Sequence, residues 1–242
     1  MQTARVHRRA LAAAVAAALL AASPVVAEYG FDVGSDSIGD APAAASNLAA
    51  RGDRVQTATT APPPAICLER RAFVIGDSLT VGALEFGGLD DVLAAAGYTA
   101  RIDARQSRFA DGGANRLAIE AAEGRLEPLV VIGLGTNDAA AGFTTAWFGD
   151  NIDRAMAAIG RSRTVLWINL QIGDLTRQAR FNDVLTFKSA QYPNLLVLDW
   201  ASQPTRQYLE GDGIHLEPEG YRLRTAYMRD RMDWATCRRL PY

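Results

Sequence analysis

Histidine is almost absent from this sequence, which contains only His7 and His215. A structural metal site in a protein usually needs several histidine or cysteine ligands, so a centre built mainly from such ligands is excluded. Any catalysis with a histidine as general base must use His215, because His7 lies in a segment that we expect to be removed. We therefore predict neither a metal site nor a cofactor.

Cysteine is equally scarce. The sequence has two, Cys67 and Cys237, near the two ends of the region that shows the pattern of a folded domain. In an exported protein such a pair normally forms a disulfide, which we predict here; two free buried thiols are the alternative. Chain entropy suggests that a bridge closing so long a loop stabilises the fold by roughly 5 kcal/mol at most.

The chain has neither an excess of basic residues nor an apolar run long enough to cross a membrane. Residues 10–22 carry no charge, follow three arginines, and lead to small residues that end at Ala27, which is typical of a secretory signal peptide. An uncleaved amphipathic anchor is the alternative. Removal of residues 1–27 changes the formal net charge from −2 to −5, because three arginines and no acids are lost. We predict a secreted or cell-envelope protein without a nucleic-acid partner and without a membrane span.

Composition divides the remaining chain into two parts. Residues 28–65 are rich in alanine, threonine and other small or polar residues, end in three prolines, and show no apolar periodicity. This composition predicts a disordered linker. From residue 66 to residue 242, strand-like and helix-like segments alternate, which predicts one domain.

Five short apolar segments alternate with helix-like segments in this domain. The predicted strands are 72–76, 99–104, 129–134, 164–170 and 195–200, and the predicted helices are 82–96, 116–125, 145–161, 175–192 and 218–234. Such an alternation predicts an α/β fold, with a parallel sheet between two layers of helices. Right-handed crossovers favour a doubly wound, flavodoxin-like strand order of 2-1-3-4-5.

In that order the turns after strands one and three are neighbours at the carboxyl edge of the sheet. The first turn is Gly76-Asp77-Ser78-Leu79 and the second is Gly135-Thr136-Asn137-Asp138. A third polar segment, Asp212-Gly213-Ile214-His215, follows strand five and precedes the last helix. All three segments are expected to meet at one crevice.

These segments contain the groups that acyl transfer needs. A serine hydroxyl is a poor nucleophile until a base takes its proton, and His215 is the available base for Ser78. Asp212 can orient the imidazole, with Asp199 as the alternative acid. The backbone N–H of Ser78 and the side-chain amide of Asn137 are candidate donors to an oxyanion.

The three segments resemble blocks I, III and V of the SGNH, or GDSL-type, hydrolases in order and spacing. Glu219-Gly220-Tyr221, after the histidine, also fits, and the resemblance covers about residues 70–232. It implies a serine esterase or acyl-transfer fold. In that fold Ser78 would be the nucleophile, His215 the base and Asp212 its partner.

Block II of the family differs from this sequence. The family has a glycine after strand two whose N–H joins the oxyanion hole, and Ser107 stands at the matching position. Its N–H can serve if φ stays negative; Gly112 or Gly113 are the alternatives. The segment 103–108 also resembles SGNH domains that act on O-acetyl groups of bacterial envelope polysaccharides. We predict that Arg108 contacts substrate, a solvated surface arginine being the alternative.

The sequence therefore predicts a monomeric, exported serine hydrolase that cleaves a short acyl ester of a small molecule or a glycan. One alternative is an O-acetyltransferase that uses the same residues on a cell-envelope glycan. Another is a non-catalytic protein that binds glycan in the same crevice. Nucleotide binding is disfavoured, because the turn after strand one has one glycine and not a glycine-rich phosphate loop.

Overall fold

A five-stranded parallel sheet forms the centre of the molecule in the computed structural model, which describes residues 66–67 and 69–238. The strands are β2 (Arg71–Gly76), β3 (Thr99–Ala104), β4 (Leu129–Gly133), β5 (Thr164–Ile168) and β6 (Leu195–Leu198). Their spatial order is β3-β2-β4-β5-β6, and every neighbouring pair is parallel. This confirms the predicted order 2-1-3-4-5. The predicted signal peptide (1–27) and linker (28–65) lie outside the described residues.

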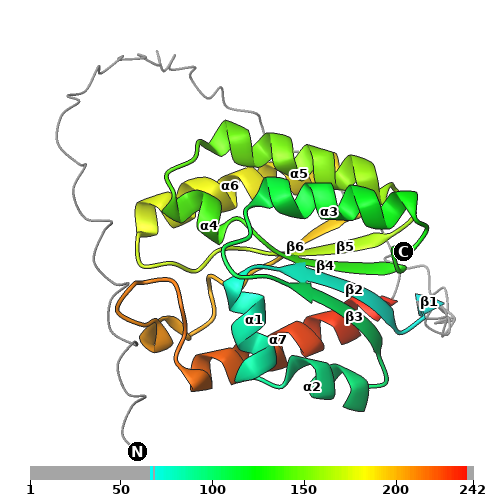
Figure 1. Cartoon of the computed structure of the whole chain (residues 1–242), viewed down its shortest axis with the longest axis horizontal. Helices are drawn as coiled ribbons and strands as arrows, with labels where there is room; N and C mark the ends of the chain where they lie inside the picture. The colour runs from blue at the N-terminus through cyan, green and yellow to red at the C-terminus, as the bar shows by residue number, and fades with distance from the viewer. Residues whose placement is uncertain (1–65, 68, 239–242) are drawn as a thin grey trace, which may run out of the picture. The chain divides into compact units, whose positions relative to one another are not determined.

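Helices cover both faces of the sheet (Figure 1). One layer contains α3 (Ala110–Ala122), α5 (Thr145–Ile159) and α6 (Leu175–Gln191); the other contains α1 (Ser78–Glu85), α2 (Leu89–Ala95) and α7 (Pro218–Thr236). Alternate residues of each strand enter different cores. In β4, Val130 and Ile132 pack in the α3 layer, whereas Leu129 and Val131 pack in the α1 layer. Burial on both faces explains why this strand is apolar throughout.

Helix boundaries differ from the prediction more than strands do. The predicted helix 82–96 is two helices, α1 and α2, because Gly88 between them has φ 60°, in the left-handed region. α3 begins at Ala110 and not at residue 116. A short helix α4 (Thr136–Ala140) and a 3₁₀ turn η1 (Arg206–Tyr208), neither of them predicted, lie in connections at the carboxyl edge.

A second, two-stranded sheet joins the two ends of the described chain. β1 (Ile66–Cys67) pairs antiparallel with β7 (Cys237–Arg238), and the register places Cys67 opposite Cys237. β7 follows α7 directly, and the hydroxyl of Thr236 at the end of α7 lies 2.7 Å from that of Tyr98. Tyr98 precedes β3, so this small sheet lies toward the amino ends of the parallel strands.

Candidate active site

The turn that carries Ser78, the predicted nucleophile, is a tight strand-to-helix connection. β2 ends at Gly76, Asp77 caps α1 by accepting a 3.0 Å hydrogen bond from the Leu79 N–H, and Ser78 is the first residue of the helix. A side chain at Gly76 would lie 1.9 Å from Thr80 Oγ1, so the turn requires glycine there. The Gly-Asp-Ser segment thus places a serine at the carboxyl edge, beside the positive end of a helix.

The three predicted catalytic residues form one chain of hydrogen-bonding contacts. His215 Nε2 lies 3.0 Å from Ser78 Oγ, and His215 Nδ1 lies 2.6 Å from Asp212 Oδ2. The other carboxylate oxygen of Asp212 accepts the N–H groups of Ile214 (2.8 Å) and His215 (2.9 Å). The carboxylate therefore folds its own loop and orients the imidazole at the same time.

Asp212 stays ionised in this arrangement. Partial burial raises the pKa of its carboxyl, but the hydrogen bonds from the His215 side chain and from the two N–H groups lower the pKa further, below its usual value. The alternative acid, Asp199, instead accepts hydrogen bonds from Asn169 Nδ2 (2.9 Å) and the Ser202 N–H (3.3 Å). Asp199 thus belongs to the connections after β5 and β6, and Asp212 is the partner of His215.

The predicted oxyanion donors lie around the nucleophile turn. Within the described part of the chain, the N–H groups of Ser78 and Ser107 donate to no acceptor. The amide nitrogen of Asn137 is 3.2 Å from the Arg108 carbonyl oxygen and 3.4 Å from Asp77 Oδ2. Asn137 therefore connects the loop after β3 with the nucleophile turn.

The two alternative glycines have other hydrogen-bond acceptors. The Gly112 N–H donates to Asp111 Oδ1 (2.6 Å), and the Gly113 N–H donates to the carbonyl of Phe109, the residue that precedes α3 (3.1 Å). Ser107, in contrast, is exposed in the loop before this helix. The geometry favours Ser107 as the block II donor.

The negative φ on which the predicted role of Ser107 was conditional is not observed. Among the described residues, Ser107 is the one non-glycine residue with a positive φ, at 55°. A left-handed conformation costs an ordinary L-residue about 1–2 kcal/mol. Such a conformation persists where the surrounding contacts require it.

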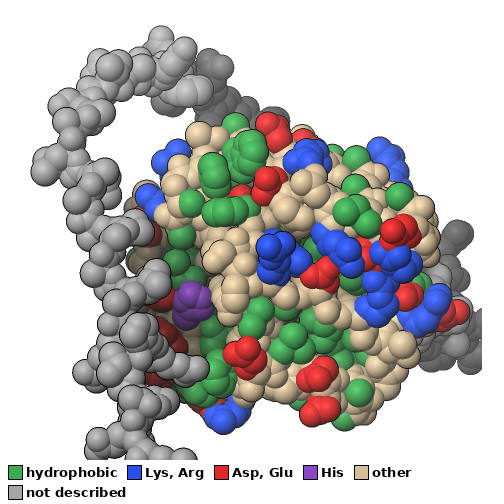
Figure 2. Space-filling view, viewed as in Figure 1, with side chains coloured by type: hydrophobic (Ala, Val, Ile, Leu, Met, Phe, Trp, Pro, Cys, Tyr) green, Lys and Arg blue, Asp and Glu red, His purple; other side chains and the backbone are tan. Residues whose placement is uncertain are grey.

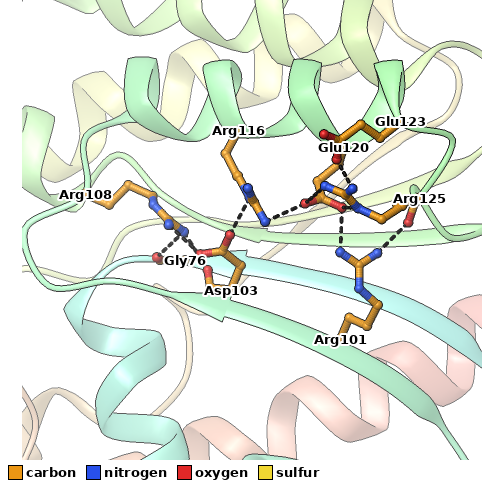
Figure 3. Close-up of polar contacts among 8 residues, drawn as sticks. All are labelled: Gly76, Arg101, Asp103, Arg108, Arg116, Glu120, Glu123 and Arg125. Carbon is orange, nitrogen blue, oxygen red and sulfur yellow. Dashed lines mark hydrogen bonds and ion pairs between the residues drawn. The ribbon is translucent and has the colours of Figure 1, made fainter.

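Arg108 is mostly buried, and its guanidinium binds protein groups. The side chain is 9% exposed. Nη1 donates to the carbonyl oxygens of Gly76 (3.2 Å) and Asp103 (2.5 Å), and Nη2 donates to Asp103 Oδ1 (2.5 Å) (Figure 3). This placement differs from the predicted substrate contact. The side chain supports the loop that carries Ser107.

Sequence reasoning missed a second arginine near the nucleophile. Arg224 of α7 is 3% exposed, and its guanidinium lies 5.3 Å from the ring centre of Trp200. Burial raises the pKa of Asp77 to about 6, and the positive charge of Arg224 opposes this rise. Helical spacing could have revealed Arg224, because Tyr221 and Met228, three positions before and four after it, are buried core residues.

Two further features concern the described residues only. They contain no group of three or more histidine, cysteine or acidic side chains placed to hold a metal ion. Over the same residues, no helix has both the length and the apolar character that crossing a membrane requires.

Comparisons with known proteins found similarity in structure. No protein-family model matches the sequence, and the search of curated proteins gave no match. Among solved structures, a lipase/acylhydrolase from Enterococcus faecalis is 24% identical with a TM-score of 0.58, over 71% of this chain and all (100%) of that one. The psychrotrophic esterase EstA from Pseudoalteromonas sp. is 19% identical with a TM-score of 0.55, over 69% of this chain and 99% of that one.

A third structure is the C-terminal catalytic domain of peptidoglycan O-acetyltransferase A from Streptococcus pneumoniae. It is 17% identical with a TM-score of 0.55, over 68% of this chain and 93% of that domain. A protein of the G-D-S-L lipolytic family from Desulfitobacterium hafniense is similar to the same degree, with a TM-score of 0.56 at 18% identity. The resemblance predicted from the three motifs is thus confirmed for the fold: this chain has the fold of the SGNH/GDSL hydrolases.

Proposed function

We propose that this protein is an exported serine hydrolase that cleaves a short acyl ester through an acyl-enzyme on Ser78. The observation that carries the proposal is the continuous contact from Ser78 Oγ through both ring nitrogens of His215 to Asp212. The similar structures that are described as esterases and acylhydrolases support it.

The geometry supports a two-step reaction. In the first step, Ser78 Oγ bonds to the ester carbonyl carbon and His215 Nε2 takes the serine proton. The N–H groups of Ser78 and Ser107 and the side-chain amide of Asn137 meet the oxyanion, and the alcohol leaves with the proton from His215. In the second step, His215 activates a water molecule that hydrolyses the acyl-enzyme. Asp212 stabilises the imidazolium in both steps.

Export and the disulfide belong to the same proposal. The basic, apolar and small-residue segments of residues 1–27 support removal of a signal peptide, which would leave Glu28 as the first residue. The register of β1 and β7, with Cys67 opposite Cys237, supports a disulfide between them. Amino-terminal sequencing of the exported protein tests the cleavage site.

The test of catalysis is initial-rate hydrolysis of p-nitrophenyl esters, from acetate to palmitate, by residues 28–242. Ser78→Ala should lower kcat by about 10⁴- to 10⁶-fold, because it removes the nucleophile. Ser189→Ala, a change of a half-buried serine on α6, is the matched control and should keep wild-type rates. Equal activity of the wild type and Ser78→Ala would remove Ser78 from the mechanism.

Acyl transfer to a glycan is the second candidate function. The similarity to the catalytic domain of a peptidoglycan O-acetyltransferase favours it, because the same acyl-enzyme serves both reactions. The acceptor distinguishes them. With p-nitrophenyl acetate as donor and a soluble glycan as acceptor, a transferase forms acetylated glycan detectable by mass spectrometry, whereas a hydrolase releases acetate only.

A further inference from the structure

Arg108 lies where the three loops of the site meet. Its side chain contacts the carbonyl oxygen of Gly76, two residues before Ser78, and both the carbonyl and the carboxylate of Asp103 near the end of β3. Its own carbonyl oxygen accepts the amide of Asn137, in the segment after β4. One residue thus joins the ends of three neighbouring strands.

Asp103 also forms an ion pair with a second arginine, Arg116 of α3. Its second carboxylate oxygen is 2.7 Å from Arg116 Nε, and Arg116 Nη2 is 2.6 Å from Oε1 of Glu120 on the same helix, α3. Glu120 is fully buried and also pairs with Arg101 and Arg125. Figure 3 shows this network between β3 and α3, and Figure 2 shows acidic and basic side chains intermixed over the same region.

Ser107 lies directly before Arg108 and has the left-handed conformation that a serine rarely adopts. No hydrogen bond of its own N–H holds it there among the described residues. The contacts of Arg108 therefore restrain the backbone at this point. They also fix the Ser107 loop relative to the turn that carries Ser78.

We propose that Arg108 is a positioning residue for acyl transfer. Its guanidinium, oriented by Asp103, holds the Ser107 N–H where it joins the Ser78 N–H at the oxyanion. This inference rests on the proposed function of Ser78. In this inference Arg108 does not bind substrate. It contributes to stabilising the transition state indirectly, by positioning the Ser107 N–H.

Arg108→Lys separates geometry from charge. Lysine keeps the positive charge but lacks the planar guanidinium that donates to Gly76 and Asp103 at the same time. Loss of one oxyanion donor lowers kcat by about 10²- to 10³-fold, and we expect a decrease of this size with KM unchanged. The matched control is Arg105→Lys, a change of an exposed arginine in the same loop, which should keep wild-type kinetics.

A second variant tests whether the effect passes through Ser107. Glycine adopts a positive φ without the cost that serine has, so Ser107→Gly in the Arg108→Lys background should restore kcat by at least about fivefold. A role in stability alone would lower the melting temperature without this rescue. Wild-type kcat in Arg108→Lys, or a loss that Ser107→Gly leaves unchanged, would overturn the inference.

A second readout separates this inference from the proposed function. A p-nitrophenyl phosphonate reacts with an activated serine: Ser78 Oγ bonds to phosphorus, His215 takes the proton, and p-nitrophenolate leaves. Intact-mass analysis should show slower phosphonylation of Arg108→Lys than of Arg105→Lys, by a factor similar to that for kcat. A wild type that is phosphonylated but hydrolyses no ester would refute the proposed function alone. Equal phosphonylation of both variants would refute the role of Arg108 alone, and a wild type that does neither would refute both.

Discussion

Asp77 supports the nucleophile turn at an electrostatic cost. Its carboxylate caps α1, yet the side chain is 1% exposed. Burial raises its pKa from 3.8 to about 6, although the charge of Arg224 opposes the rise. A carboxyl with a raised pKa binds a proton more readily in the folded than in the unfolded state. Its contribution therefore lowers the folding stability as pH rises from 3.8 to about 6, and stays constant above that range.

Asp77→Asn removes this titration. The free energy of unfolding of the wild type, minus that of the variant, should fall by about 3 kcal/mol across this pH range, because two pKa units correspond to that energy. Urea unfolding of both proteins at several pH values between 4 and about 6 measures the difference. A difference that rises with pH would contradict the assignment, whereas a constant offset from altered capping would not affect the slope.

The sequence predicted which side chains meet at the site, and missed the features that depend on distant contacts. Ser78 was recognisable because it stands in a short motif at the end of a strand, and Asp212 and His215 because they share a short motif just before the last helix. The positive φ of Ser107 was not recognisable from the sequence. It depends on Arg108, whose side chain contacts Gly76, 32 positions earlier in the chain. Local sequence does not specify such a contact.

At the scale of elements, the break between α1 and α2 depends on one glycine. Gly88 has φ 60°, and a side chain there would meet no atom within 4 Å. Gly88→Ala should therefore cost about 1 kcal/mol of unfolding free energy from backbone conformation alone. Gly211 also has open space around it but lacks a positive φ. Gly211→Ala should leave stability within about 0.5 kcal/mol of the wild type.

Urea denaturation of the two variants under one condition provides the comparison. Equal destabilisation by both would mean that the loss arises from the added methyl group and not from the conformation of Gly88. A stable Gly88→Ala variant would mean that α1 and α2 tolerate a different connection.

Strands were predictable because apolar runs between two helix layers have no other place to be buried. The first residues of the helices were harder to predict from the sequence. The first N–H of α3, at Ala110, donates to Asp138 Oδ2 at 2.9 Å, so a residue 28 positions later caps this helix. Two glycines in its first turn, Gly112 and Gly113, lower the local helix propensity and concealed the start. The β1–β7 pair was missed because two-residue strands have no periodicity.

For the molecule as a whole, the proposed Cys67–Cys237 disulfide would tie the two ends of the domain together. Reduction should then lower the free energy of unfolding by up to roughly 5 kcal/mol. The double variant Cys67→Ser/Cys237→Ser should unfold at the same denaturant concentration with and without reductant. Thiol titration of the denatured, unreduced protein checks the bridge directly. Two reactive thiols per chain would contradict it.

Helix α7 crosses the molecule from the catalytic edge to the opposite one. It begins at Pro218, three residues after His215, and ends at Thr236 beside Tyr98, where β3 begins. The points at which the described chain enters and leaves, β1 and β7, are therefore remote from Ser78 (Figure 1). A resin, an electrode or a fusion partner joined through either point would therefore be attached at the end of the sheet opposite the edge that carries Ser78.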